Sequence, residues 1–159
     1  MGALAGLAPL WLAGCAQPPG LRTTDPAQGY WRGRLALRVD APSEPTSFFA
    51  NFELSGAADA GELLLSSPLG TTLAQLSWSP RSALLRNNGR TRAFDSLDAL
   101  AVEATGTAIP IAALFEWLQG RAVPADGWQA DLTQLRAGRL LARRVLPAPT
   151  AELRLILEP

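Results

Sequence analysis

Histidine and lysine are absent from this chain of 159 residues, and cysteine, methionine and tyrosine occur once each. The lack of histidine excludes His-based catalytic triads, the usual zinc ligand sets and imidazole general bases. A single cysteine excludes a disulfide within the chain. The 14 arginines balance 14 acidic residues to zero net charge, so the sequence offers no basic stripe for a nucleic acid.

Motifs of common catalytic and nucleotide-binding loops are also missing. The glycine-rich stretches contain no G-x-S-x-G, G-x-x-x-x-G-K or G-x-G-x-x-G pattern. Carboxylates such as Glu53, Glu62, Asp95 and Asp98 could in principle pair for acid/base chemistry, but their exposed strand and helix-start positions are explained by solvation. We therefore expect no enzyme, no metal and no cofactor.

What is present begins with Leu12-Ala13-Gly14-Cys15, which has the order of a bacterial lipobox. It closes an apolar run from Ala3 to Ala13, about as long as the core of a signal peptide and well short of the roughly 18 residues that span a bilayer. The sequence predicts a signal peptide over residues 1–14, cleavage before Cys15 and lipidation of Cys15. No basic residue precedes the apolar run, which departs from the usual signal peptide. The alternative to a lipobox is a chance match of these four residues in an alanine- and leucine-rich chain.

The chain from Cys15 onward has 145 residues (159 minus 14), which suits a single domain. Residues 15–29 contain turn formers and little to bury, so we expect a lipidated N-terminus and a flexible tether there. Residues 30–159 are then the folded domain.

Hydrophobic alternation with a period of two begins at Tyr30 and predicts strands that each have one apolar face. Asn88-Gly89 is a strong type I′ hairpin signal, and Ser67-Pro68-Leu69-Gly70 is a favourable turn. A helical period replaces the alternation twice, first after Asp95 or Ser96 as a cap and then from Pro110 at the first helical position. The strands are expected at 30–40, 48–55, 62–66, 72–78, 83–86, 91–94, 128–132, 139–145 and 152–158. The first helix is expected at 97–104, and the second from Pro110 to a stop at Gly120.

This order predicts a mainly β fold with two short helices. A long meander of one-faced strands must cover its apolar side, so we expect an incomplete, half-open antiparallel β-barrel with a helical lid or plug. Its apolar concavity is larger than two short helices can fill. Periodicity does not distinguish a filled core from a ligand cavity.

Several segments, in this order and spacing, resemble the LolB family of outer-membrane lipoprotein receptors. They are the lipobox, residues 34–37 (RLAL), 48–52 (FFANF), 63–72 (LLLSSPLGTT), 106–110 (GTAIP) and 114–120 (LFEWLQG). The resemblance implies the LolA/LolB-like half-barrel, anchored by lipid to the outer membrane and facing the periplasm. Ala16 is consistent with the outer membrane as the destination, since aspartate directly after the lipidated cysteine is the inner-membrane retention signal of enterobacterial lipoproteins.

The same resemblance implies that the domain, as a monomer, accepts lipoproteins from a soluble periplasmic LolA-like carrier and inserts them into the inner leaflet of the outer membrane. Pro68, Leu69 and Gly70 would form the membrane insertion loop. Twelve residues are candidates for the acyl-chain cavity, although for any single one of them ordinary core is the favoured interpretation; they are Trp31, Phe48, Phe52, Leu54, Leu65, Leu76, Trp78, Phe94, Phe115, Trp117, Leu118 and Trp128. A scaffold or lipid sensor that transfers nothing, with its half-barrel filled by side chains, is the alternative function.

Overall fold

A computed structural model describes residues 23–159. The predicted signal peptide and Cys15 lie outside the described residues. The described chain forms nine strands, two α-helices and two short 3-10 helices: η1 (Pro26–Gln28), β1 (Tyr30–Asp40), β2 (Thr46–Gly56), β3 (Gly61–Ser66), β4 (Thr72–Ser79), β5 (Ser82–Asn87), β6 (Arg90–Phe94), α1 (Leu97–Thr105), α2 (Ile111–Leu118), β7 (Trp128–Asp131), η2 (Leu135–Ala137), β8 (Arg139–Arg144) and β9 (Thr150–Leu157).

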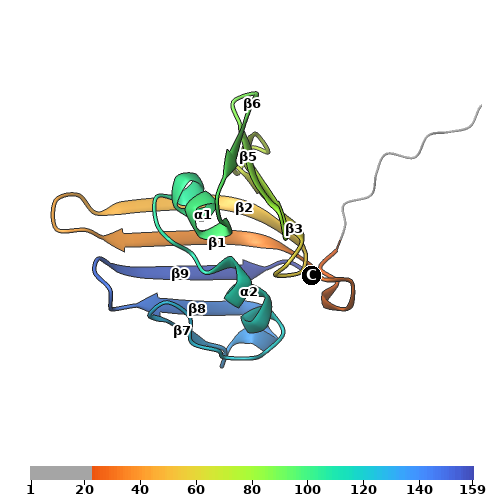
Figure 1. The fold of residues 1–159 in the computed structure, drawn as a ribbon. Helices are drawn as coiled ribbons and strands as arrows, with labels where there is room; N and C mark the ends of the chain where they lie inside the picture. The colour runs from red at the N-terminus through yellow and green to blue at the C-terminus, as the bar shows by residue number, and fades with distance from the viewer. Residues whose placement is uncertain (1–22) are drawn as a thin grey trace, which may run out of the picture.

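All nine strands belong to one antiparallel sheet in the order β6-β5-β4-β3-β2-β1-β9-β8-β7. The first six strands follow one another as a meander, and so do the last three. The two meanders meet where β1 pairs with β9. Strands β6 and β7 are the free edges of the sheet, so the barrel stays open, as predicted (Figure 1).

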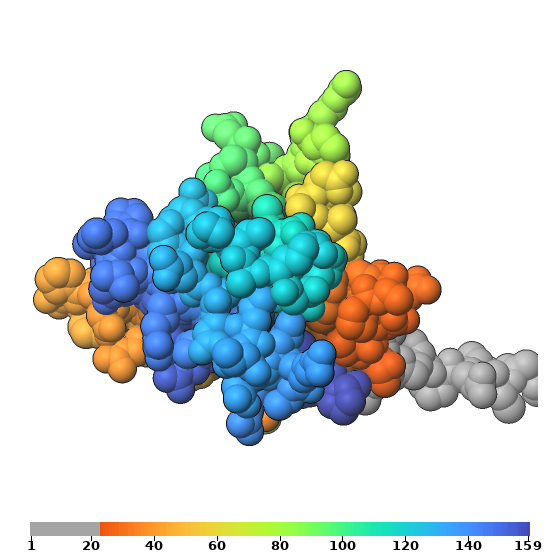
Figure 2. Space-filling model, turned by 90° about the horizontal axis from the view of Figure 1, so that it is seen from below, coloured from red at the N-terminus to blue at the C-terminus, as the bar shows by residue number. Residues whose placement is uncertain are grey.

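The sheet curves around its apolar face. Along β1 and β2 buried side chains alternate with more exposed ones, which confirms the predicted period of two. Figure 2 shows the turn between β1 and β2 beside the turn between β8 and β9, at the end of the domain opposite its first described residues.

The predicted turns are present. Asn88 and Gly89 have φ values of 48° and 73°, the positive pair that a type I′ turn requires. The amide of Gly70 donates to the Ser67 carbonyl over 2.8 Å, which closes the turn after β3.

The helix starts confirm one prediction and correct another. Ser96 caps α1 by accepting a hydrogen bond from the Ala99 amide, and Gly106 ends it in the left-handed conformation. Pro110 was predicted as the first residue of α2, but its ψ of 82° is not helical and it is the residue before the helix. Proline fixes only φ, so ψ still decides on which side of the boundary it falls.

Residues 24–29, which lie within the predicted tether, contact the sheet. Asp25 caps η1 and forms an isolated bridge with Tyr30. The Thr24 hydroxyl donates to the Glu158 carbonyl and accepts from the Arg32 amide. These bonds attach residues 24–29 to the start of β1 and the end of β9, because polar side chains in the segment satisfy backbone groups of the sheet.

Gly33 lies at the seam between the two meanders, and we expect its replacement to destabilise the domain. A Cβ at Gly33 would overlap the carbonyl oxygen of Ile156 in β9, a backbone atom that cannot turn away. Gly33→Val should lower the free energy of unfolding by about 3 kcal/mol. Chemical denaturation measures this.

The matched control is Arg34→Ala, an exposed change on the same strand that should alter stability by no more than about 0.5 kcal/mol. Equal unfolding midpoints for both variants would contradict the close approach of β1 and β9.

Candidate functional site

The concave face of the sheet is covered by residues 95–127, which we call the helical strap. The strap leaves one edge of the sheet at β6 and reaches the other edge at β7, and it carries α1 and α2 between them (Figure 1). The strap therefore connects β6 and β7 through the chain itself, on the side of the barrel where no hydrogen bonds join these two edge strands.

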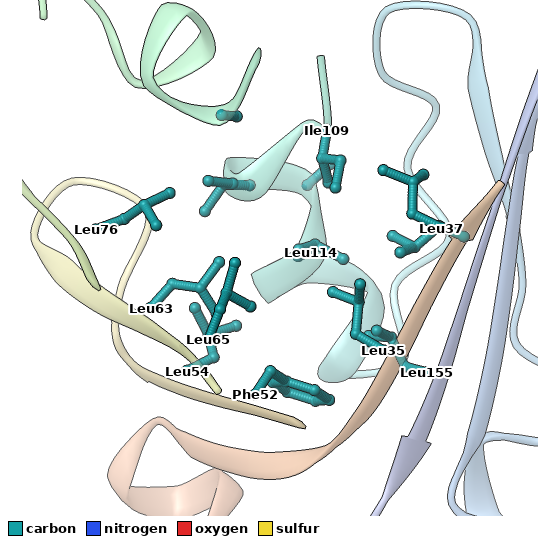
Figure 3. Close-up of a cluster of buried hydrophobic side chains, with 14 of the residues drawn as sticks. Leu35, Leu37, Phe52, Leu54, Leu63, Leu65, Leu76, Ile109, Leu114 and Leu155 are labelled. Carbon is teal, nitrogen blue, oxygen red and sulfur yellow. The ribbon is translucent and has the colours of Figure 1, made fainter. Parts of the chain in front are cut away.

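Helix α2 is the part of the strap that lies deepest. Six of its eight residues are buried, whereas α1 buries only Leu100 and Ala101. Figure 3 shows Leu114 of α2 and Ile109 among side chains that point inward from the strands on both sides. The concave face is thus filled by α2 in this structure.

Aromatic side chains join α2 to the sheet. The Phe115 ring packs edge-on against Trp31 of β1 at 5.8 Å between ring centroids and against Trp78 of β4 at 6.1 Å. The Trp117 indole donates to the Val123 carbonyl over 2.6 Å, and Trp128 donates to the Ala108 carbonyl over 3.0 Å. Two indoles of this core therefore bond to backbone groups of the strap.

The structure brings the twelve predicted cavity residues into one cluster. Ten are buried, and Phe48 and Phe94 are half-buried against them. The buried ten are Trp31, Phe52, Leu54, Leu65, Leu76, Trp78, Phe115, Trp117, Leu118 and Trp128. Their role as contacts of an acyl chain stays a prediction.

Sequence reasoning left out aliphatic members of the same cluster. They share the inward positions of the strands or the strap with the leucines that were predicted, Leu54, Leu65, Leu76 and Leu118, so the same hydrophobic periods were the available signal. They include Leu35, Leu37, Leu63, Ile109, Leu114, Leu140, Leu153 and Leu155.

Arg144 is a charged residue that the sequence analysis also missed. It is 6% exposed, and its Nη2 donates to the Thr107 hydroxyl and to the Pro149 carbonyl, each over 3.1 Å. Its guanidinium lies 5.4 Å from the centre of the Trp128 ring. No carboxylate pairs with it among residues 23–159. The period of two in β8, which turns Leu140 and Ala142 inward, was the available signal.

Two buried donors of this region have no acceptor in the described part of the chain, the Trp31 indole nitrogen and Nε of Arg144. An unsatisfied buried donor costs about 1–3 kcal/mol. The strap therefore packs closely on the sheet but leaves these two buried donors without hydrogen-bond acceptors.

At the end of α2, the Arg121 guanidinium donates to the Glu116 carboxylate, and this hydrogen bond holds the pKa of Glu116 below its ordinary value. Both side chains are exposed. The last turn of the strap's deepest helix therefore keeps a charged pair in water while its other face is buried.

The turn after β3 presents Leu69 to solvent, with 95% of its surface exposed. The Ser67 amide donates to the Thr71 carbonyl over 2.8 Å, and Asn51 of β2 donates to the Ser67 carbonyl over 3.2 Å. The side chain of Leu69 takes no part in these bonds. The exposed position predicted for it is confirmed, while membrane insertion stays a prediction.

Within residues 23–159 no group of three or more metal-ligating side chains comes together. None of the helices described there has the length and hydrophobicity to cross a bilayer.

Comparison with known proteins gives one consistent family. A family model described as "Outer membrane lipoprotein LolB" matches residues 30–144. The chain is 32% identical over 143 residues to the outer-membrane lipoprotein LolB of Dechloromonas aromatica, an alignment that covers 77% of this chain and 75% of that protein. It is 31% identical to the LolB of Bordetella petrii, with 95% and 88% covered, and 34% identical to that of Cupriavidus pinatubonensis, with 84% and 66% covered. Since the matched residues include β1 to β8 and the whole strap, this chain belongs to the LolB family of outer-membrane lipoproteins.

Proposed function

We propose that this chain accepts lipoproteins from a soluble LolA-like carrier in the periplasm and inserts them into the inner leaflet of the outer membrane. In this proposal Cys15 carries the lipid that anchors the domain, and the domain faces the periplasm. Family membership supports the general role, and the geometry of the concave face supports the mechanism.

The observation that carries the proposal is a continuous apolar concave face on an open sheet, covered by a strap rather than by more strands. An acyl chain is long, apolar and flexible, and to bind on the concave face it needs the volume that α2 occupies. Among the described residues the sheet ladder pairs strands only with other strands. Moving α2 away from Phe52 and Leu65 therefore breaks packing but leaves that ladder intact.

The donors left unsatisfied in the closed packing, on Trp31 and Arg144, favour such an exchange. An incoming lipid brings ester and amide carbonyls, which accept hydrogen bonds, together with its acyl chains. The transfer uses no nucleotide in this proposal, so the affinity for the acyl chains must rise from the carrier to this domain and from this domain to the bilayer.

A domain that transfers nothing is the second candidate, and the dense packing of α2 favours it. Six buried residues of α2 fill the face that the first candidate assigns to lipid. A carrier-to-receptor assay separates the two. A labelled lipoprotein loaded on the carrier should move to this protein, whereas a scaffold or sensor would leave it on the carrier.

Acyl binding itself should depend on the inward face of β2. We expect a form beginning at residue 23, which keeps the contacts of Thr24 and Asp25, to bind an apolar fluorescent probe. Phe52→Asp should weaken that binding at least tenfold, since a carboxylate in an apolar site costs several kcal/mol. Probe titration measures the change.

Phe49→Asp is the matched control, because Phe49 lies on the same strand but faces outward and is 66% exposed. Its binding should equal that of the unchanged domain. Thermal unfolding of each variant separates lost binding from lost folding. Phe52→Leu serves as the apolar replacement at the same position. A folded, unchanged domain that binds no probe would support the scaffold.

A further inference from the structure

The convex face of the sheet carries an apolar groove that the concave site does not use. Residues of β1, β2 and β9 line it, and Pro68 of the turn after β3 borders it; its volume is about 280 Å³. Phe49 is 66% exposed and Ile156 42% exposed. Exposed apolar side chains that gather in this way mark an interaction surface. The groove also adjoins the turn that presents Leu69.

Two arginines flank this groove without a carboxylate partner. In the register of the sheet Arg34 of β1, Ile156 of β9 and Arg139 of β8 stand side by side in one row. Arg34 and Arg139 are exposed, and neither forms an ion pair within the part of the chain that the structure describes. Both guanidinium groups are therefore available to an external anion.

The next basic residues along the face are already partly neutralised. Arg143 and Arg154 both donate to Glu152, and the hydrogen bond from Arg143 holds the pKa of that carboxyl below its ordinary value. Two arginines share one carboxylate, which leaves this group of three side chains with a net positive charge, and Arg154 stands in the row of Ala36 and Phe49. The apolar groove thus lies between basic side chains on two rows of the sheet.

The predicted anchor keeps this face close to a membrane. Thr24, which bonds to the sheet, comes nine residues after Cys15 (24 minus 15), and nine residues span at most about 30 Å. Thr24 is bonded to Arg32 and Glu158, at the ends of the same strands, β1 and β9, whose outer side forms the groove. A chain anchored at Cys15 can therefore lay the convex face on the bilayer.

We propose that the convex surface formed by Phe49, Ile156, Arg34 and Arg139 docks the domain on anionic phospholipid. The two arginines bind headgroup phosphates, and Phe49 and Ile156 enter the interfacial region. Paired apolar and basic side chains fit such a surface because apolar burial and attraction to anionic lipid add together. Docking leaves the concave face and the strap open to the periplasm.

This inference does not depend on lipoprotein transfer. A domain could dock in this way and transfer nothing, or transfer lipoproteins without docking. The test therefore observes the position of the convex face at the membrane and contains no carrier or cargo.

The experiment uses the lipidated full chain in phosphatidylcholine vesicles with and without phosphatidylglycerol. Cys15 is the only cysteine and is consumed by the lipid, so Phe49→Cys offers one thiol for a fluorophore. A quencher on the lipid should quench that fluorophore when phosphatidylglycerol is present. Thr91→Cys, on the exposed strand β6, is the control and should stay unquenched.

Arg34→Gln combined with Arg139→Gln should lower the ratio of docked to undocked protein about 25-fold, or about fivefold for each arginine near the anionic surface. Arg86→Gln combined with Arg90→Gln removes the same charge from the β5–β6 hairpin and should change nothing. High salt should weaken docking of the otherwise unchanged chain, which tests the charges without those substitutions.

Three results would overturn the proposal: equal quenching at positions 49 and 91, equal effects of the two arginine pairs, or, in a separate sample to which a soluble carrier protein is added, a fluorophore at position 49 that responds to the carrier but not to lipid. The last of these would assign the face to a protein partner. Circular dichroism of each variant confirms that the sheet is retained.

Discussion

Replacement of Cys15 by alanine should abolish the covalent attachment of fatty acid to the protein. The thiol is the predicted acylation site, and the sequence contains no other cysteine. We expect complete loss of label in cells fed a labelled fatty acid, together with a precursor that the lipoprotein signal peptidase leaves uncleaved. The protein should consequently be lost from its place in the outer membrane, since stable anchoring depends on several acyl chains acting together.

A second variant separates the position of the thiol from its presence. Cys15→Ala combined with Phe49→Cys restores one cysteine on the exposed face of β2, outside the lipobox. It should remain unlabelled. Incorporation of label by Cys15→Ala itself would show that residues 12–15 are not a lipobox.

Leu69→Glu should uncouple acceptance of a lipoprotein from its release. The turn is held by backbone bonds and by Asn51, so stability should change by no more than about 0.5 kcal/mol. Entry of a carboxylate into the bilayer is disfavoured where leucine is favoured, and we expect release into liposomes to fall about tenfold. Loading from the carrier should be unchanged, because Leu69 does not contribute to the buried cluster.

Liposome release of a labelled lipoprotein from equally loaded proteins measures this effect. Thr91→Glu places the same charge on the distant strand β6 and should release at the unchanged rate, while Leu69→Met should retain most of the release. Equal rates for Leu69→Glu and Thr91→Glu would remove Leu69 from the insertion step.

Much of the fold could be predicted because single residues set local structure. The alternation around Leu35 and Leu37 defined β1, and Asn88-Gly89 defined the turn between β5 and β6. The start of α2 was wrong by one residue, since proline at position 110 is compatible with either side of a helix boundary. The contacts of Thr24 with residue 158 could not be predicted, because they depend on strands that come together only in the folded domain.

The site was harder to predict than the fold for a different reason. An inward residue such as Leu65 has the same pattern whether it faces a helix, a lipid or both, so the sequence could not distinguish a filled core from a cavity. Arg144 was overlooked because an arginine in a strand is ordinarily exposed, and here hydrogen bonds and the Trp128 ring replace its water. Leu69 was the easier case, since its turn alone places it in solvent.

The pairing of β1 with β9 has a consequence for how the chain reaches its fold. Leu35 pairs with Leu155, 120 residues later (155 minus 35), whereas every other strand pair joins neighbours in sequence. Contacts of such large sequence separation form slowly, since a long loop must be closed before they are gained. We expect the two meanders to form early and their seam to form last, so the edge of β1 that faces β9 stays unpaired until residues 150–157 are available to pair with it.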